Sequence, residues 1–364
     1  MITALLVVGI LVFLIVVHEL GHFVVAKLFR VRVEEFGIGY PPRAFTLGKI
    51  GDTEYTLNWI PFGGFVRLFG DVGDDRHGKG SFADANRGAQ ALVLVAGIAM
   101  NIVAAWALFA IALHAGIPRV IDSATENESA RLIIASVVQS SPASVAGITI
   151  GDEILAVRDV SGSAPTVLTP EAFSEFVQTR GGEELELTYL RGQEEKTTRI
   201  IPAHAVIPEE SGKPALGVAI VLVSTESLPW SAALREAVPA TKNSFVMVAQ
   251  GLWGILEKAF AGKPSLSEVV GPIGLASIVG DAARNGVGEV LKLAAFISVN
   301  LAIINLIPVP ALDGGRLALL GFEALTRRGA PRLALQAFNA FGILLIVVLM
   351  VTVTYQDVAR LIFP

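Results

Sequence analysis

The chain has 364 residues, of which 53% are hydrophobic and only 17% are charged. This composition is unusual for a soluble protein and indicates an integral membrane protein. The net charge of -5 argues against binding to nucleic acid, and the absence of cysteine excludes disulfides and thiolate metal sites. Any metal ion must therefore be bound by histidine and carboxylate side chains.

Four apolar runs approach the roughly 20 residues needed to cross a hydrocarbon layer about 30 Å thick. No basic residue precedes the first run and no small-residue cleavage site follows it, so we expect a retained helix rather than a secretory signal. The sequence predicts a polytopic α-helical membrane protein with four spans, at Thr3 to Val25, Ala91 to Ile117, Leu293 to Leu312 and Leu333 to Val353.

Basic residues near the spans predict the orientation of the chain. They gather in the loop after the first span and in the short loop before the last span, which places both loops in the cytoplasm. The two termini and the segment 118–290 are then expected outside. The basic residues are Lys27, Arg30, Arg32, Arg43, Lys49, Arg67, Arg76, Lys79 and Arg87 in the first loop, and Arg327, Arg328 and Arg332 in the second.

The first span carries the sequence HELGH. His18 and His22 are four residues apart, so their rings project from one helix face and can hold one zinc ion. In the H-E-x-x-H arrangement Glu19 is the base for a metal-bound water. Ionisable groups inside a span are costly and indicate a functional site that faces the bundle interior. The alternatives are a proton relay or a helix-packing device.

A β-hairpin is predicted between the first two spans, with a turn at residues 51–52, because apolar and polar residues alternate over 55–59. One interpretation is an interfacial hairpin that caps the bundle. The other is an edge strand that pairs with an extended peptide. In that case Tyr55, Leu57 and Trp59, together with a helix break at Pro308 and Pro310, would bind an unwound substrate segment. Residues 1–117 thus form the first part of the membrane core.

Residues 118–224 predict a small α+β domain on the outer side. A helix begins at Pro142, a second runs from Thr169 to Thr179, and a hairpin turns at Arg191-Gly192. The stretch SPASVAGITIGDEILAV resembles a segment of bacterial PDZ domains, and ALGVAIVL near Leu216 resembles the loop and strand with which they hold a peptide carboxylate. The resemblance implies either binding of a peptide terminus or a spacer that binds nothing.

Residues 225–290 are expected to form amphipathic helices on the outer side. The stretch from Thr241 to Phe260 is apolar without interruption only between Asn243 and Glu257, which is short for a span. We therefore expect an interfacial helix that lies on the bilayer. A fifth span would also place the two basic loops on opposite faces.

Residues 291–364 hold the second part of the membrane core. A catalytic zinc site usually has three protein ligands and one open position, so His18 and His22 need a partner. Asp313 lies in an apolar region, after Pro308 and Pro310 have broken the helix. The sequence favours Asp313 as the third ligand, and the alternative is that it only caps the next helix.

Together the motifs resemble the site-2 protease family of intramembrane zinc metalloproteases. The resemblance implies that His18, His22 and Asp313 bind Zn²⁺, that Glu19 is the general base, and that Asn305 helps to hold the substrate. The residues that carry it are His18, Glu19, His22, Asn305, Pro308, Pro310, Leu312, Asp313, Gly314 and Gly315.

The stretches PFGGFVRL and GPIG, with the PDZ-like segment, further resemble the bacterial regulator of sigma-E protease type. Many of its members carry two PDZ domains, and this chain has room for one. The expected function is cleavage of single-span membrane proteins, such as an anti-sigma factor or remnant signal peptides, in a bacterial inner membrane. A non-catalytic chaperone or scaffold is the alternative. A transporter is disfavoured because the sequence shows no internal repeat.

Overall fold

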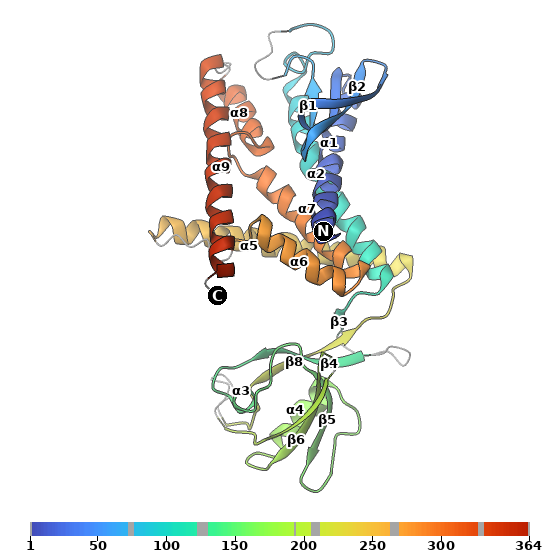
Figure 1. Cartoon of the computed structure of the whole chain (residues 1–364), viewed down its shortest axis with the longest axis vertical. Coiled ribbons are helices and arrows are strands. Elements are labelled where there is room, and N and C mark those ends of the chain that lie inside the picture. The colour runs from blue at the N-terminus through green and yellow to red at the C-terminus, as the bar shows by residue number, and fades with distance from the viewer. Residues whose placement is uncertain are drawn as a thin grey trace. The chain divides into compact units, whose positions relative to one another are not determined.

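A computed structural model describes residues 2–71, 76–121, 130–192, 194–204, 212–262, 269–326 and 331–362. The chain separates into two compact units (Figure 1). The helical unit consists of Met1–Ala115 together with Leu228–Pro364, and the inserted unit is Gly116–Ser227. The inserted unit therefore interrupts the helical unit after its second long helix.

In the described part of the chain, four helices are long and apolar enough to cross a membrane. They are α1 (Ile2–Leu28), α2 (Arg87–Ala115), α7 (Val287–Leu306) and α9 (Arg332–Ile362). The prediction of four membrane helices is confirmed, and the protein is a membrane protein. One predicted limit is wrong, because α7 ends at Leu306 and not at Leu312. Pro308 has no backbone N–H and cannot continue the helix. Of the basic residues that predict the orientation, Arg327 and Arg328 lie outside the described residues.

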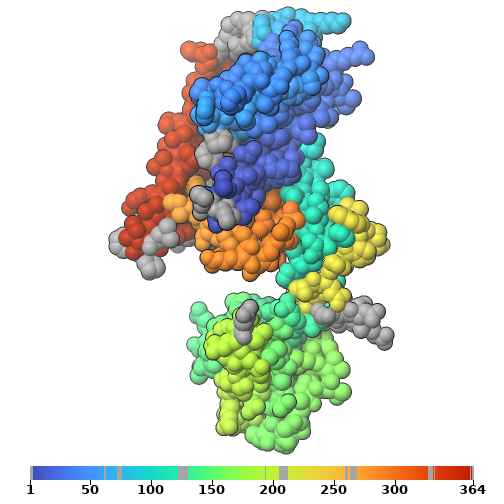
Figure 2. Space-filling model, turned by 45° about the vertical axis from the view of Figure 1, so that its right-hand side comes forward, coloured from blue at the N-terminus to red at the C-terminus, as the bar shows by residue number. Residues whose placement is uncertain are grey.

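Small residues bring the central helices together. The backbone of Gly21 in α1 lies so close to the Ala96 carbonyl of α2 that no Cβ would fit. Ala105 and Ala112 of α2 are fully buried. Membrane helices use small residues at such contacts because van der Waals packing, rather than the hydrophobic effect, holds them together. By contrast, only 11% of the α9 span is buried, and this helix (red) lies along one side of the unit in Figure 2.

One carboxylate joins α9 to α6 (Pro272–Arg284). Asp357 accepts hydrogen bonds from the backbone N–H groups of Gly271, Ile273 and Gly274, at 3.2, 3.1 and 2.8 Å. The GPIG segment thus forms a helix N-terminus whose free donors are satisfied by a side chain from another helix. The negative charge also lies at the positive end of the α6 dipole.

The helix predicted from Thr241 begins earlier, because α5 spans Trp230–Phe260 and continues through Pro239. Its first turns pack on α2, where the Trp106 indole N–H donates to the Leu234 carbonyl at 3.0 Å. This tertiary contact explains why the helix starts before the segment that the sequence indicates. Although α5 has 31 residues, it is not among the described helices that are apolar enough to cross a membrane.

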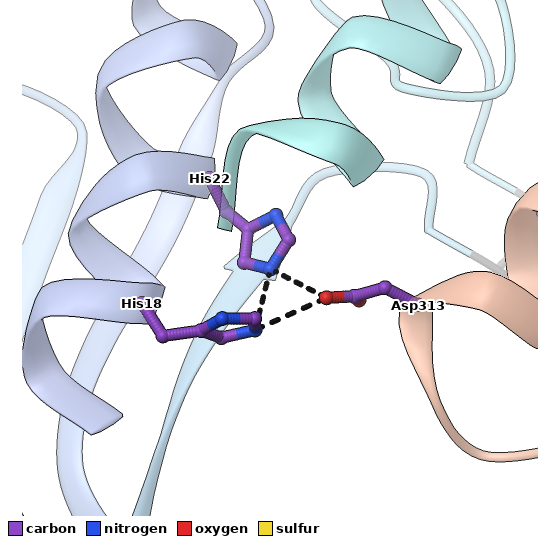
Figure 3. A group of neighbouring side chains, drawn as sticks. All are labelled: His18, His22 and Asp313. Carbon is purple, nitrogen blue, oxygen red and sulfur yellow. Dashed lines mark hydrogen bonds and ion pairs between the residues drawn. The ribbon is translucent and has the colours of Figure 1, made fainter. Parts of the chain in front are cut away.

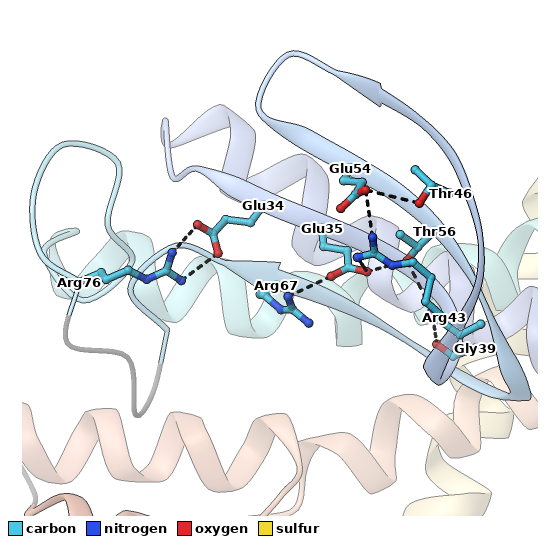
Figure 4. Close-up of polar contacts among 10 residues, drawn as sticks. Glu34, Glu35, Gly39, Arg43, Thr46, Glu54, Thr56, Arg67 and Arg76 are labelled. Carbon is cyan, nitrogen blue, oxygen red and sulfur yellow. Dashed lines mark hydrogen bonds and ion pairs between the residues drawn. The ribbon is translucent and has the colours of Figure 1, made fainter.

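The hairpin consists of β1 (Val33–Ile50) and β2 (Thr53–Leu68), joined by the predicted turn at Gly51 and Asp52. In the alternating segment 55–59 the polar residues Thr56 and Asn58 are buried on the inner face of the hairpin, and apolar residues face outward. On the inner face Glu35 forms ion pairs at 3.0 Å with Arg43 and Arg67 (Figure 4). The exposed apolar side chains include Phe45, Leu47, Ile50 and Trp59. An exposed apolar surface of this kind is typical of a membrane or protein contact.

The predicted edge strand over 55–59 is wrong. Tyr55 pairs with Phe36 on one side and with Gly48 on the other, and Leu57 likewise has two neighbours. The long strands fold back on themselves, so the start of β1 also pairs with the end of β2. The edges of the sheet are therefore the segments 43–50 and 64–68.

In its described residues the inserted unit is a six-stranded sheet with two short helices. The strand order is β3-β8-β4-β5-β6-β7. The predicted helices are confirmed as α3 (Pro142–Val145) and α4 (Pro170–Gln178), each with proline in its first turn. Among the described strands, the short β3 is one that the sequence did not predict. The strands are β3 (Arg119–Ile121), β4 (Ala130–Val137), β5 (Glu153–Asp159), β6 (Leu185–Arg191), β7 (Glu194–Ile200) and β8 (Val218–Ser224).

A buried carboxylate fixes the turn before β5. Asp152 is 1% exposed and accepts hydrogen bonds from Arg191 Nε at 2.8 Å and Nη2 at 2.7 Å, and from the Thr149 N–H at 2.8 Å. Burial raises the pKa of Asp152, but the hydrogen bonds from Arg191 and Thr149 lower it by more. The net lowering means that the folded unit stabilises the ionised carboxylate.

We expect Asp152→Asn to lower the free energy of unfolding of the inserted unit by about 1–3 kcal/mol at pH 7, because the charged hydrogen bonds to Arg191 are lost. The native pKa is lowered, so this contribution is present above the unfolded value near 4 and disappears as the pH falls toward the native pKa. Hydrogen exchange of peptides from 130–200 in the full chain measures the loss, with Glu195→Gln on exposed β7 as the control. Equal protection in wild type and variant would contradict it.

Candidate metal centre

Two histidine side chains project from one face of α1, as the i, i+4 spacing predicts. His18 and His22 are each 8% exposed, and their Nε2 atoms lie 3.2 Å apart. Figure 3 shows both rings turned toward α8 (Asp313–Thr326). The surrounding helix is apolar, so the two imidazoles are the polar groups around which this part of the unit must be built.

The backbone between α7 and α8 brings Asp313 to the histidines. The proline-containing segment 307–312 leaves the helical path, and Ala311 adopts a left-handed φ of 70°. Gly314 and Gly315 then lie so close to the carbonyls of 306–309 that side chains could not be accommodated. The glycines thus allow α8 to begin directly against this segment, with Asp313 in its first turn.

The three predicted ligands form a nearly equilateral triangle. Asp313 Oδ2 lies 3.0 Å from His18 Nε2 and 3.2 Å from His22 Nε2. Ligand atoms about 2.0–2.2 Å from a tetrahedral zinc ion are about 3.3 Å apart, so these separations fit the metal. Asp313 Oδ2 is buried and has no hydrogen bond of good geometry. A cation is the partner that this donor set needs.

The opposite side of the centre is formed by α2. The ring of His22 is fixed by a 2.7 Å contact between Nδ1 and the Val93 carbonyl, where Nδ1–H donates and Nε2 is left for the metal. A Cβ at Gly97 would lie 2.7 Å from His18 Cε1 and 2.8 Å from His18 Nε2. Only glycine leaves room for both rings.

A cavity of about 350 Å³ opens at the centre. His18, Glu19 and Asp313 line it together with Tyr40, Asn101 and Asn305, next to Leu11, Ile15, Gly63, Leu301, Ala311 and Leu312. Glu19 also lies within hydrogen-bonding reach of the Val66 backbone N–H. The cavity therefore places the Glu19 carboxylate beside two of the three candidate ligands, His18 and Asp313.

Of the predicted substrate-binding residues, only Asn305 lines this cavity. Pro308 is exposed. Pro310 is buried, and its carbonyl lies against Gly342 of α9. The ring of Tyr55 packs against α1, 6.2 Å from the Phe23 ring. Leu57 and Trp59 are exposed on the hairpin. Substrate binding by these residues stays a prediction.

The sequence interpretation missed three residues at the centre: Tyr40, Gly97 and Asn101. Burial and, to a smaller extent, the charge of Glu19 raise the pKa of the Tyr40 phenol, so it keeps its proton at neutral pH and can donate a hydrogen bond. Gly97 and Asn101 are four residues apart in α2. Such a pair in an apolar span is a signal for one face directed at a polar site.

Two imidazoles, a carboxylate and a neighbouring glutamate inside a bundle of membrane helices define the site of a membrane metallopeptidase. The model of Peptidase family M50 matches residues 6–349, and the chain belongs to this family, the site-2 proteases. The expected family is therefore confirmed.

Relatives of similar length agree. The chain is 36% identical over 355 residues to a predicted zinc metalloprotease of Clostridium perfringens, with 96% of each chain covered. It is 31% identical to one of Clostridium acetobutylicum over 97% of each chain. The zinc metalloprotease RasP of Oceanobacillus iheyensis is 26% identical over 96% of each chain.

Among solved structures, the PDZ domain of an SdrC-like protein from Listeria monocytogenes matches 27% of this chain and 92% of its own. The identity is 18% and the TM-score 0.22.

Gly97→Ala tests the geometry of the centre. The added methyl group would displace the His18 and His22 rings, and we expect zinc affinity to fall by about 10- to 100-fold, as when groups that orient metal ligands are changed. Zinc content after dialysis against a chelator measures it. Gly9→Ala in α1, where a Cβ meets nothing within 4 Å, is the matched control. Zinc retention by Gly97→Ala equal to that of the control would contradict the proposed ligand geometry.

Proposed function

We propose that the protein is a zinc endopeptidase that hydrolyses peptide bonds within or near the transmembrane segments of other membrane proteins. The observation that carries this proposal is the triangle of His18, His22 and Asp313 inside the helical unit, with Glu19 at the same cavity. Membership of a peptidase family, zinc metalloprotease relatives and the fit of the ligands to zinc all support it.

The chain's own residues supply the acid–base chemistry. When bound, zinc polarises the scissile carbonyl and makes water acidic enough to react near neutral pH. Glu19 accepts the proton of the attacking water and passes it to the departing amine. Asn305, at the same cavity, donates a hydrogen bond to the substrate backbone. Tyr40 is a second neutral donor at the cavity wall.

The reaction takes place below the membrane surface on the cytoplasmic side. His18 lies nine residues before Lys27 at the end of α1, which corresponds to about 14 Å along a helix. With the basic loops inside, both termini and the inserted unit are outside, and the protein is a multi-pass protein of a bacterial plasma membrane. Segment 230–260 then lies on the outer face of the bilayer.

The substrate is a single-span membrane protein, such as an anti-sigma factor or a remnant signal peptide. A membrane helix offers no extended backbone, so it must unwind before cleavage. The edge segment 64–68 can receive the unwound segment as an added strand, because its start adjoins α1 at Glu19 and Gly63 lines the cavity.

The inserted unit acts as a PDZ-like screen on the outer side. The start of β8 pairs only with β4 among the described strands, and the Leu216 carbonyl before it accepts from Ala143 N–H at 2.9 Å. A peptide terminus released by an earlier cut would bind there by strand addition, or a bulky outer domain would be excluded by size. A non-catalytic scaffold of the same fold would not need Glu19, which separates the two functions.

Glu19→Gln tests the enzymatic function. Loss of the base should lower cleavage by about 10²- to 10⁴-fold while zinc stays bound, because the ligands are untouched. We would co-express wild type, Glu19→Gln and exposed Glu257→Gln with a panel of single-span membrane proteins and measure both cleavage and zinc. Asp313→Asn should lower zinc and cleavage together. Equal cleavage by wild type and Glu19→Gln would refute the role of Glu19.

The edge segment can be tested by cross-linking, because the chain has no cysteine of its own. In a Glu19→Gln background, we expect Phe65→Cys to form a disulfide with a cysteine near the cleavage site of the substrate. Leu47→Cys, which is exposed at the other edge of the sheet, should not. Cross-linking at Leu47→Cys alone would place the substrate on the wrong edge for this proposal.

A further inference from the structure

The metal centre is bordered by an asparagine that has no assigned role. Asn101 lies in α2, is 0% exposed, and its amide nitrogen is 3.2 Å from His18 Nδ1. Its Oδ1 atom is buried without a hydrogen-bond partner. Leaving a buried polar atom unpaired destabilises the folded chain, so a fully buried asparagine with a free Oδ1 needs a physical reason.

A histidine binds zinc through an unprotonated nitrogen, and the other ring nitrogen then carries the proton and needs an acceptor. For His22 this acceptor is the Val93 carbonyl, 2.7 Å from Nδ1. For His18, the Asn101 side chain is the group that the described residues place at Nδ1. The two ligands thus have different supports, one from the backbone and one from a side chain.

The Asn101 amide can serve either tautomer of His18. With the amide nitrogen toward Nδ1, the ring accepts there and its Nε2–H faces Asp313 Oδ2 at 3.0 Å. A half-turn of the amide about the Cβ–Cγ bond brings Oδ1 to Nδ1 instead. Nδ1–H then donates to Oδ1, and Nε2 is free for a metal ion.

The backbone of Asn101 is fixed independently of its side chain. Its carbonyl oxygen accepts a 2.8 Å hydrogen bond from Ser298 Oγ of α7, and Ser298 is also fully buried. This contact holds α2 against α7 at the level of the metal centre. It also supplies a control, because removal of the Ser298 hydroxyl disturbs the same position without touching His18.

We propose that Asn101 is a positioning residue for zinc: its Oδ1 accepts from His18 Nδ1–H and selects the tautomer and ring orientation that bind the metal. This inference rests on the proposed zinc site. Asn101 would supply the acceptor for His18 Nδ1–H, a partner that the ligand motif does not specify. Removal of such partners usually costs about 10- to 100-fold in metal affinity.

The test is zinc affinity of the full chain, purified in detergent and titrated against a competing chelator. We expect Asn101→Leu to weaken zinc binding by about 10- to 100-fold. Asn101→Asp keeps an acceptor at the same place and should bind zinc within about threefold of wild type, as should Ser298→Ala. Asn101→Ala repeats the loss with a smaller side chain if leucine does not fit. Melting temperatures of the zinc-free forms separate folding from affinity.

Wild-type affinity in both Asn101→Leu and Asn101→Ala would overturn the inference while leaving the zinc site intact. Equal loss in Asn101→Asp and Asn101→Leu would also overturn it, because an acceptor would then make no difference. A wild-type chain that binds no zinc would instead refute the proposed function, so the two failures are distinguishable.

Discussion

The convergence of His18, His22 and Asp313 on one point is the constraint on which the helical unit depends. Burial of ionisable groups in a membrane is unfavourable unless a group or ion of opposite charge lies beside them. Here one carboxylate oxygen faces two imidazoles at 3.0 and 3.2 Å, and the set has room for a divalent cation. The neighbouring backbones must come very close to enclose it. Gly97 at the rings and Gly314 and Gly315 behind the aspartate are the positions where that closeness excludes a side chain.

Among the three ligands, Asp313 is held in place by several elements of the helical unit. Its helix, α8, starts after a segment that prolines prevent from being helical, and this segment in turn is packed against Gly342 of α9. One turn into α8, Arg316 forms an ion pair with Asp71 from the loop after the hairpin. The loop after the hairpin, α8 and α9 therefore all help to fix the position of the Asp313 carboxylate. A metal ligand at a helix start is precise only when the loop before it is held in this way.

Whether a feature could be predicted from the sequence depends on whether it is set by local geometry or by contacts between residues far apart in the chain. The two histidines share a face because helical geometry alone decides it, and Asp313 could be found because a zinc site needs a third ligand. The edges of the hairpin sheet could not be found, since the pairing of Tyr55 with both Phe36 and Gly48 depends on strands that bend back. The early start of α5 depends on Trp106 in another helix. Asn101 was missed because one polar side chain in an apolar helix does not show which ring it faces.

In the proposed function, cleavage of a membrane helix requires new hydrogen-bond partners for the backbone that unwinding exposes, and the cavity offers polar groups for this. Each unsatisfied backbone group in a lipid environment costs several kcal/mol, so unwinding even one turn is prohibitive without new partners. The cavity is lined by polar residues, among them Glu19, Tyr40 and Asn305, and by apolar residues such as Leu11 and Leu301. In the proposed function, the apolar lining residues hold the side chains of a hydrophobic substrate, and the polar ones, with the nearby sheet edge, bind its backbone.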